Sequence, residues 1–351
     1  MNSLVIQSRQ DYRSFCQKFY SGVKWRMPMI TISLCMIVKN EEKNLERCLK
    51  SYAPLMDEII VVDTGSTDRT KEIASRFTDK IYDFEWICDF SAARNFSFEK
   101  ATCDYIFSAD ADEVLDDQNR AQFEILKQVL DEEIEIVQMY YGNQFQNGTI
   151  YNYDCELRPK LFKRLRTFKW IEPIHETVRT LPVVFDSDIV ITHLPENSHT
   201  KRDLAAFERM VTEEIPISPR LHNIYAKELF VSGDKEDFEK AIGFFEESFS
   251  DETRAEDEKL EAICVLSKAY RMLGKDAKFI KYALLSEIGL CSELCYEIGQ
   301  YFYENEEHKD ALHWFSMASE YTKPILNIHY GDKYPKEGIE KCMLKLGENA
   351  Q

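Results

Sequence analysis

The chain has 351 residues, of which 44% are hydrophobic and 30% are charged, and its formal net charge is −18. This composition supports packed cores, so disorder is not the expected state, and the length allows two domains or three small ones. The negative charge argues against a nucleic-acid binder, because phosphate contacts need clustered lysine and arginine.

The ten cysteines show neither paired spacing nor a zinc-like interval, so we expect reduced thiols in a cytoplasmic protein. Residues 1–26 lack the apolar core of a signal peptide, and no apolar run reaches the roughly 18 residues of a membrane span. Apolar side chains at helical spacing in residues 8–19 predict a short helix. We therefore expect residues 1–28 to form an N-terminal helical extension.

Short apolar runs alternate with helical patterns in the next part of the chain. The expected strands are residues 31–38, 58–62, 81–84 and 105–109, and the expected helices begin near Leu45, after Ser66 or Thr67, and at Phe90. Ser66 or Thr67 is expected to cap a helix that runs through Phe77. The alternation predicts a doubly wound α/β sheet, and the absence of a G-x-G-x-x-G turn disfavours an ordinary dinucleotide fold.

The fourth expected strand ends at two carboxylates, Asp110 and Asp112, which one small residue separates. Two close carboxylates repel each other, and a divalent cation relieves that repulsion; oxygen ligands favour Mg²⁺ or Mn²⁺. An acidic turn that faces water is the alternative, because Asp-x-Asp alone is a weak signal.

Four motifs in order carry a family resemblance: residues 33–42 (SLCMIVKNEE), 60–68 (IVVDTGSTD), 89–95 (DFSAARN) and 110–112 (DAD). The chain resembles a family 2 glycosyltransferase with the GT-A fold, a doubly wound mixed sheet. The resemblance implies that Ile37, Lys39 and Asp63 hold the nucleoside and that Arg94 binds nucleotide or phosphate as a fixed cation. Asp63 could instead be a turn residue beside Gly65, and Arg94 could form a surface ion pair.

The same resemblance implies a metal site. Asp112 would ligate Mn²⁺ or Mg²⁺ directly, and Asp110 would hold the ribose or reach the metal through water. His193 follows an expected strand over residues 183–192, where the family often has a third metal ligand. A lone histidine is equally well explained as a structural residue.

Residues 168–176 bring an aromatic residue, a histidine and two glutamates together. The resemblance makes Glu176 the first candidate for the general base and Glu172 the second, with His175 positioning the acceptor or a phosphate. The alternative is a solvated strand edge.

Helical patterns continue from residue 204 almost to the end, with a weak repeat of about 34 residues. The best copy includes Gly299, Ala311 and Phe315, and it resembles a tetratricopeptide repeat. We expect a GT-A domain over 29–203 and an all-α helical-repeat domain over 204–351, which makes the chain similar to the SunS-type peptide S-glycosyltransferases. The repeats would bind a peptide or protein acceptor, or a second copy of the chain.

These features predict an inverting, metal-dependent enzyme that moves a hexose from a UDP-sugar to a cysteine, serine or threonine side chain. The alternative acceptor is a polysaccharide or lipid-linked glycan. Two further alternatives are a non-catalytic repeat adaptor with a vestigial nucleotide-sugar domain, and a nucleotidyl transferase.

Overall fold

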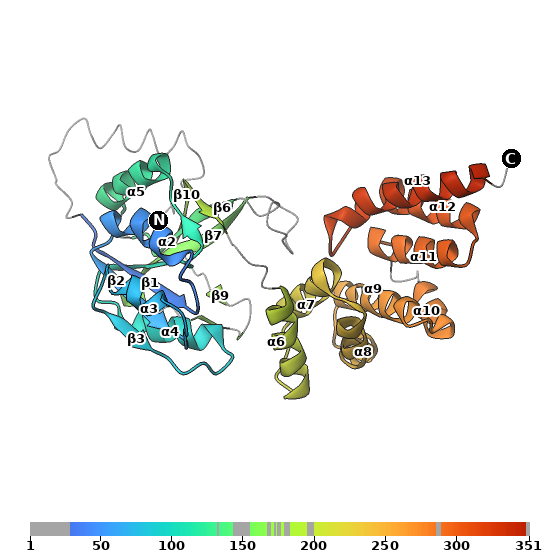
Figure 1. Ribbon diagram of the computed structural model, residues 1–351, viewed down its shortest axis with the longest axis horizontal. Coiled ribbons are helices and arrows are strands. Elements are labelled where there is room, and N and C mark those ends of the chain that lie inside the picture. The colour runs from blue at the N-terminus through green and yellow to red at the C-terminus, as the bar shows by residue number, and fades with distance from the viewer. Residues whose placement is uncertain are drawn as a thin grey trace, which may run out of the picture. The chain divides into compact units, whose positions relative to one another are not determined.

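The computed structural model describes residues 29–131, 133–142, 155–166, 170–171, 173, 177–178, 183–194, 200–285 and 289–348. The chain forms two compact units, one of residues 1–147 with 153–197 and one of residues 148–152 with 198–351 (Figure 1). The expected extension over residues 1–28 lies outside the described residues.

A mixed sheet forms the centre of the first unit (Figure 1). Its eight described strands have the order β3-β2-β1-β4-β7-β6-β10-β5. The strands are β1 (Ile32–Val38), β2 (Glu58–Asp63), β3 (Ile81–Asp83), β4 (Tyr105–Ser108), β5 (Glu113–Val114), β6 (Ile136–Gly142), β7 (Glu156–Lys163) and β10 (Val184–His193). Strands β1 to β4 pair in parallel, whereas β7 runs antiparallel to both β4 and β6. The predicted doubly wound mixed sheet is confirmed, including all four of its expected early strands.

Helices cover both faces of this sheet, which explains why its first strand is a continuous apolar run. Leu34 and Met36 of β1 enter one core, together with residues of α2 (Leu45–Tyr52), α3 (Thr70–Ala74) and α5 (Asp117–Val129). Cys35 faces the opposite core, where it meets Phe98 of α4 (Phe90–Lys100). Because successive side chains of a strand alternate between faces, one strand contributes to both cores.

Helix α3 is shorter than the sequence predicts, and the expected cap was wrong. It spans Thr70–Ala74 and its N-cap position is Arg69 rather than Ser66 or Thr67. Ser66 and Thr67 are engaged elsewhere: the Ser66 hydroxyl accepts a hydrogen bond from the Asn40 backbone, and the Thr67 backbone donates to Asn40 Oδ1. The contact between the loop after β1 and the loop after β2 therefore makes α3 begin later in the sequence than predicted.

Glu58, the first residue of β2, accepts hydrogen bonds from three other segments of the chain. Its carboxylate accepts hydrogen bonds from Lys80 Nζ (2.5 Å), the Thr102 backbone N–H (2.8 Å) and the Ser33 hydroxyl. Burial alone raises the pKa of Glu58, but these hydrogen bonds outweigh it and lower the pKa to about 2.

The Glu58→Gln variant should be less stable by about 2 kcal/mol at neutral pH, because the amide keeps the shape but loses charge-assisted hydrogen bonds. This loss of stability is smaller than the full pKa shift of Glu58 would give, because Lys80 is half-exposed and solvent screens its charge. Folding lowers the pKa of Glu58, so its contribution to stability is fully present above the pKa that it has in the unfolded chain. This contribution is lost as the pH falls toward 2. Chemical denaturation at pH 7 and pH 3 checks this: the difference between the variant and the native chain should shrink at pH 3. Glu46→Gln, in an exposed pair with Lys50, is the control, and an equal loss in both variants would contradict the prediction.

The described part of the second unit is all helical, as predicted. Its helices are α6 (Thr200–Thr212), α7 (Pro219–Ser232), α8 (Lys235–Ser250), α9 (Glu256–Met272), α10 (Asp276–Ala283), α11 (Ser292–Glu304), α12 (His308–Ser316) and α13 (Lys333–Glu348). Phe315 of α12 is fully buried and fits between Gly299 of α11 and Gly338 of α13. Among the described residues, no helix has the length and apolar character needed to cross a membrane.

Two short connecting strands, β8 (Trp170–Ile171) and β9 (Thr177–Val178), flank the segment in which the sequence places the catalytic glutamates. Asn95 of α4 fixes the first of them: its side chain donates to the Trp170 carbonyl (3.0 Å) and accepts from the Trp170 N–H (2.7 Å). Glu172, His175 and Glu176 lie outside the described residues, so their assignment stays a prediction.

Candidate active site

The parallel strands β1, β2 and β4 deliver polar residues to one edge of the sheet. Val38 at the end of β1 pairs with Asp63 at the end of β2, and Cys35 of β1 pairs with Ser108 at the end of β4. Ligands of open α/β sheets bind at this carboxyl edge. The structure therefore brings Asp63 and the acidic residues after β4 to the edge where the sequence places them.

Asp63 is 1% exposed and uses its two oxygens differently. Oδ1 accepts hydrogen bonds from the backbone N–H groups of Gly65 (3.0 Å) and Ser66 (2.9 Å), which closes the turn after β2. Oδ2 is buried and has no hydrogen-bond partner among the residues that the structure describes. A buried acceptor without a donor costs about 1–3 kcal/mol, so Asp63 is the predicted turn residue and also carries one oxygen whose burial is not offset by a hydrogen bond from the described residues.

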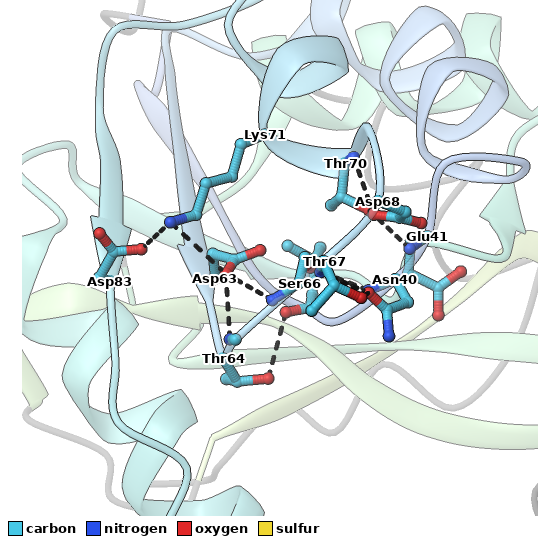
Figure 2. A network of polar contacts seen from close by, with 12 residues as sticks. Asn40, Glu41, Asp63, Thr64, Ser66, Thr67, Asp68, Thr70, Lys71 and Asp83 are labelled. Carbon is cyan, nitrogen blue, oxygen red and sulfur yellow. Dashed lines mark hydrogen bonds and ion pairs between the residues drawn. The ribbon is translucent and has the colours of Figure 1, made fainter.

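The loop after β1 is clamped onto this turn (Figure 2). Asn40 has a positive φ of 56°, a conformation that asparagine tolerates better than most residues, and its side chain accepts from the Thr67 N–H (2.8 Å). The Glu41 N–H donates to Thr70 Oγ1 (2.7 Å). Two other residues were expected to hold the nucleoside. Ile37 packs against the core that contains Cys35 and Phe98, and Lys39 is exposed just after β1.

Arg94 projects from α4 toward the end of β4 and is buried. Its guanidinium donates to Asp110 Oδ1 (2.7 Å) and Ser108 Oγ (3.1 Å), and it stacks 4.7 Å from the centre of the Trp170 ring. Burial raises the pKa of Asp110, but the charges of Arg94 and Lys160 outweigh this effect and hold it well below its usual range. Asp110 is thus a carboxylate that is already neutralised by an arginine, and its side chain is still 40% exposed.

Asp112 meets His193 across the β5–β10 pairing. His193 Nε2 lies 3.0 Å from Asp112 Oδ2, and the Leu194 N–H donates to the Asp112 carbonyl (2.9 Å). The His193 ring packs against Tyr141, with 5.1 Å between ring centres. A carboxylate oxygen and an imidazole nitrogen at this separation fit two positions of a Mg²⁺ or Mn²⁺ site.

The three predicted metal ligands do not form one cluster. Across the described ranges, no three histidine, cysteine, aspartate or glutamate side chains are arranged to hold a metal ion. Asp110 pairs with Arg94 instead. Asp112 and His193 fit a cation that takes its remaining ligands from water and phosphate, as Mg²⁺ commonly does.

Sequence reasoning missed two further ion pairs at this edge. Lys160 of β7 contacts the buried Glu113 at 2.6 Å, directly after the acidic motif. Lys71 of α3 donates to Asp83 at the end of β3 and lies 3.8 Å from Asp63 Oδ1. Both pairs join elements that are distant in the sequence, and no spacing pattern announces them.

Comparison with known proteins adds a family to this geometry. The model of glycosyl transferase family 2 matches residues 33–189. Residues 33–189 are therefore similar to a family 2 glycosyltransferase domain. It contains every candidate residue of the first unit except His193, which follows the matched range.

Two curated relatives resemble the chain over different lengths. The SPbeta prophage-derived glycosyltransferase SunS of Bacillus subtilis is 29% identical over 252 residues, which are 67% of this chain and 58% of SunS. A TPR repeat-containing protein of Synechococcus elongatus is 51% identical over 87 residues, which are 25% of this chain and 22% of that protein. The chain thus spans about a fifth to three fifths of the lengths of these relatives.

Among solved structures, the glucosyl-3-phosphoglycerate synthase of Mycobacterium tuberculosis in complex with Mn²⁺ and UDP-glucose is similar to 54% of this chain. The match covers 81% of the synthase, with 16% identity and a TM-score of 0.39. A likeness of this size says nothing about the ligands of the present chain.

Proposed function

We propose that the chain is a glycosyltransferase that moves a hexose from a UDP-sugar, in the presence of Mn²⁺ or Mg²⁺, to a peptide or protein side chain. One observation carries the proposal: within a domain similar to family 2 glycosyltransferases, an under-satisfied buried carboxylate, an arginine–aspartate pair and an aspartate–histidine pair share the carboxyl edge of the sheet. The buried carboxylate suits the nucleotide base, the arginine–aspartate pair suits the ribose or phosphates, and the aspartate–histidine pair suits a metal ion.

Each residue has a role that its surroundings favour. Asp63 accepts a hydrogen bond from the nucleoside through Oδ2, and Arg94 places a fixed positive charge beside the ribose and phosphates. Asp112 and His193 would hold the divalent cation, with Asp110 turned toward the ribose. A bound cation supplies positive charge where negative charge grows on the departing diphosphate.

The acceptor side of the reaction rests on the sequence and on the second unit. A single displacement with inversion needs a base that removes the acceptor proton as the new bond to the anomeric carbon forms. Glu176, with Glu172 as the alternative and His175 as a positioning group, remains the proposal for that base. The repeat-like helices favour a peptide or protein acceptor, because such repeats offer extended binding surfaces. We propose a cytoplasmic location, and association of two copies through the same helices.

The test is a donor screen with the whole chain. UDP-glucose, UDP-galactose and UDP-N-acetylglucosamine are incubated with Mn²⁺ or Mg²⁺, UDP release is measured, and mass spectrometry follows sugar addition to candidate peptides. We expect UDP release that EDTA abolishes. Failure to bind UDP by calorimetry would favour the adaptor alternative, sugar addition only to glycans would favour the other acceptor class, and release of pyrophosphate would favour nucleotidyl transfer.

A further inference from the structure

Asp63 does not stand alone at the end of β2. Lys71 Nζ lies 3.8 Å from Asp63 Oδ1 and donates a hydrogen bond to Asp83, the last residue of β3 (Figure 2). The Val62–Tyr82 and Asp63–Asp83 pairings of the parallel strands put the two aspartates side by side. Asp83 therefore holds a protonated lysine next to the carboxylate proposed to meet the nucleoside.

The two oxygens of Asp63 limit what a ligand can offer. Oδ1 already receives two backbone hydrogen bonds, whereas Oδ2 has no donor in the described part of the chain. A single free acceptor beside a cation is complementary to an N–H group next to a carbonyl. Lys71 has three donors, of which Asp83 takes one, and its side chain is 46% exposed and can turn to a ligand.

We propose that Lys71, held by Asp83, selects the nucleotide base by donating to the carbonyl beside the base N–H that binds Asp63 Oδ2. This inference rests on the proposed function, because it names the base edge that the same donor site reads.

Comparison of the bases makes the selection specific. Uracil presents N3–H next to the O4 carbonyl and matches the pair. Cytosine presents an acceptor at N3 and an amino donor beside it, so it meets Asp63 and Lys71 with the wrong groups at both positions, and adenine does the same. Guanine has N1–H next to O6, but its extra amino group needs a second acceptor, and Asp63 Oδ1 is occupied.

The experiment is calorimetric titration of the full chain with UDP, CDP, GDP and ADP. The native chain should bind UDP at least about tenfold more tightly than CDP, with ADP weakest and GDP between. Lys71→Met should weaken UDP binding about tenfold and leave CDP binding unchanged, so that the UDP-to-CDP ratio collapses. Lys71→Arg keeps a donor and should retain most of the ratio, and Asp83→Asn should reduce it partly.

A matched control and the contrary outcomes separate this inference from the proposed function. Lys50→Met removes an exposed lysine that pairs with Glu46 on α2 and should change neither affinity. An equal loss of UDP and CDP binding in Lys71→Met would assign Lys71 a structural role only, and unchanged UDP binding would remove any role; either result overturns the inference while the donor site stands. A native chain that binds no nucleotide would instead overturn the proposed function.

Discussion

Replacement of Asp112 by asparagine should lower the rate of UDP release from a UDP-sugar by about a thousandfold, which corresponds to roughly 4 kcal/mol of transition-state stabilisation. The amide keeps the size of the side chain and its contact with His193, but it removes the negative charge that favours a divalent cation. Loss of rate with intact folding would place the effect on metal binding.

The readout for this prediction includes more than activity. Titration with Mn²⁺ in the presence of UDP should show weaker metal binding in Asp112→Asn, and a thermal melt should be unchanged within about 0.5 kcal/mol, as for most substitutions away from cores. Asp117→Asn, an exposed aspartate at the start of α5, is the control and should retain full activity. Full activity of Asp112→Asn in a metal-free assay would remove Asp112 from the metal role.

The sequence predicted the carboxyl edge of the sheet well, because the signal is local. Each expected strand is a short apolar run, and Asp63 and Asp110 come directly after or at the end of such runs. Strand ends in a parallel sheet meet at one edge, so the positions of these residues in the fold follow from the alternation of strands and helices.

The partners of these residues could not be predicted in the same way. Asp110 was expected near a metal, yet its closest described charge partner is Arg94, sixteen positions earlier. The Lys160–Glu113 pair and the Lys71–Asp83 pair likewise depend on which strands become neighbours. Ion pairs between distant elements leave no periodic pattern, so only the folded chain shows which acidic groups are neutralised by protein and which are left for a ligand.

The predicted start of α3 is wrong for the same reason, because it depends on contacts between distant parts of the chain. Ser66 and Thr67 are good capping residues by type, but both serve the contact with Asn40, and Asp68 accepts from the Thr70 N–H (3.0 Å). In contrast, the small and large residues of the helical repeat were predicted correctly, because their spacing reflects the packing of helices that are neighbours in the sequence. The structure places Phe315 of α12 against Gly299 of α11, and both residues belong to the best repeat copy in the sequence.

That contact supports a prediction about stability in the second unit. A Cβ added at Gly299 would lie 2.7 Å from Phe315 Cδ1 and 2.8 Å from Cε1, closer than real carbon contacts allow. On the other side of the ring, a Cβ at Gly338 would lie 2.7 Å from Cδ2, so Phe315 cannot move away from α11 without striking α13. Gly299→Ala should therefore cost about 3 kcal/mol, at the upper end of overpacked cores.

The same substitution elsewhere in the unit should have the opposite sign. Within the described ranges, a Cβ at Gly243 of α8 meets nothing within 4 Å, so Gly243→Ala should stabilise the protein by about 0.5–1 kcal/mol through the helical preference of alanine. Thermal unfolding followed by circular dichroism measures both changes. Phe315→Leu in the Gly299→Ala background should recover part of the loss, because a smaller side chain leaves room for the added methyl group. Equal and small effects of the two alanines would show that α11 and α12 do not approach as closely as the structure places them, and UDP binding by the first unit should persist in both variants.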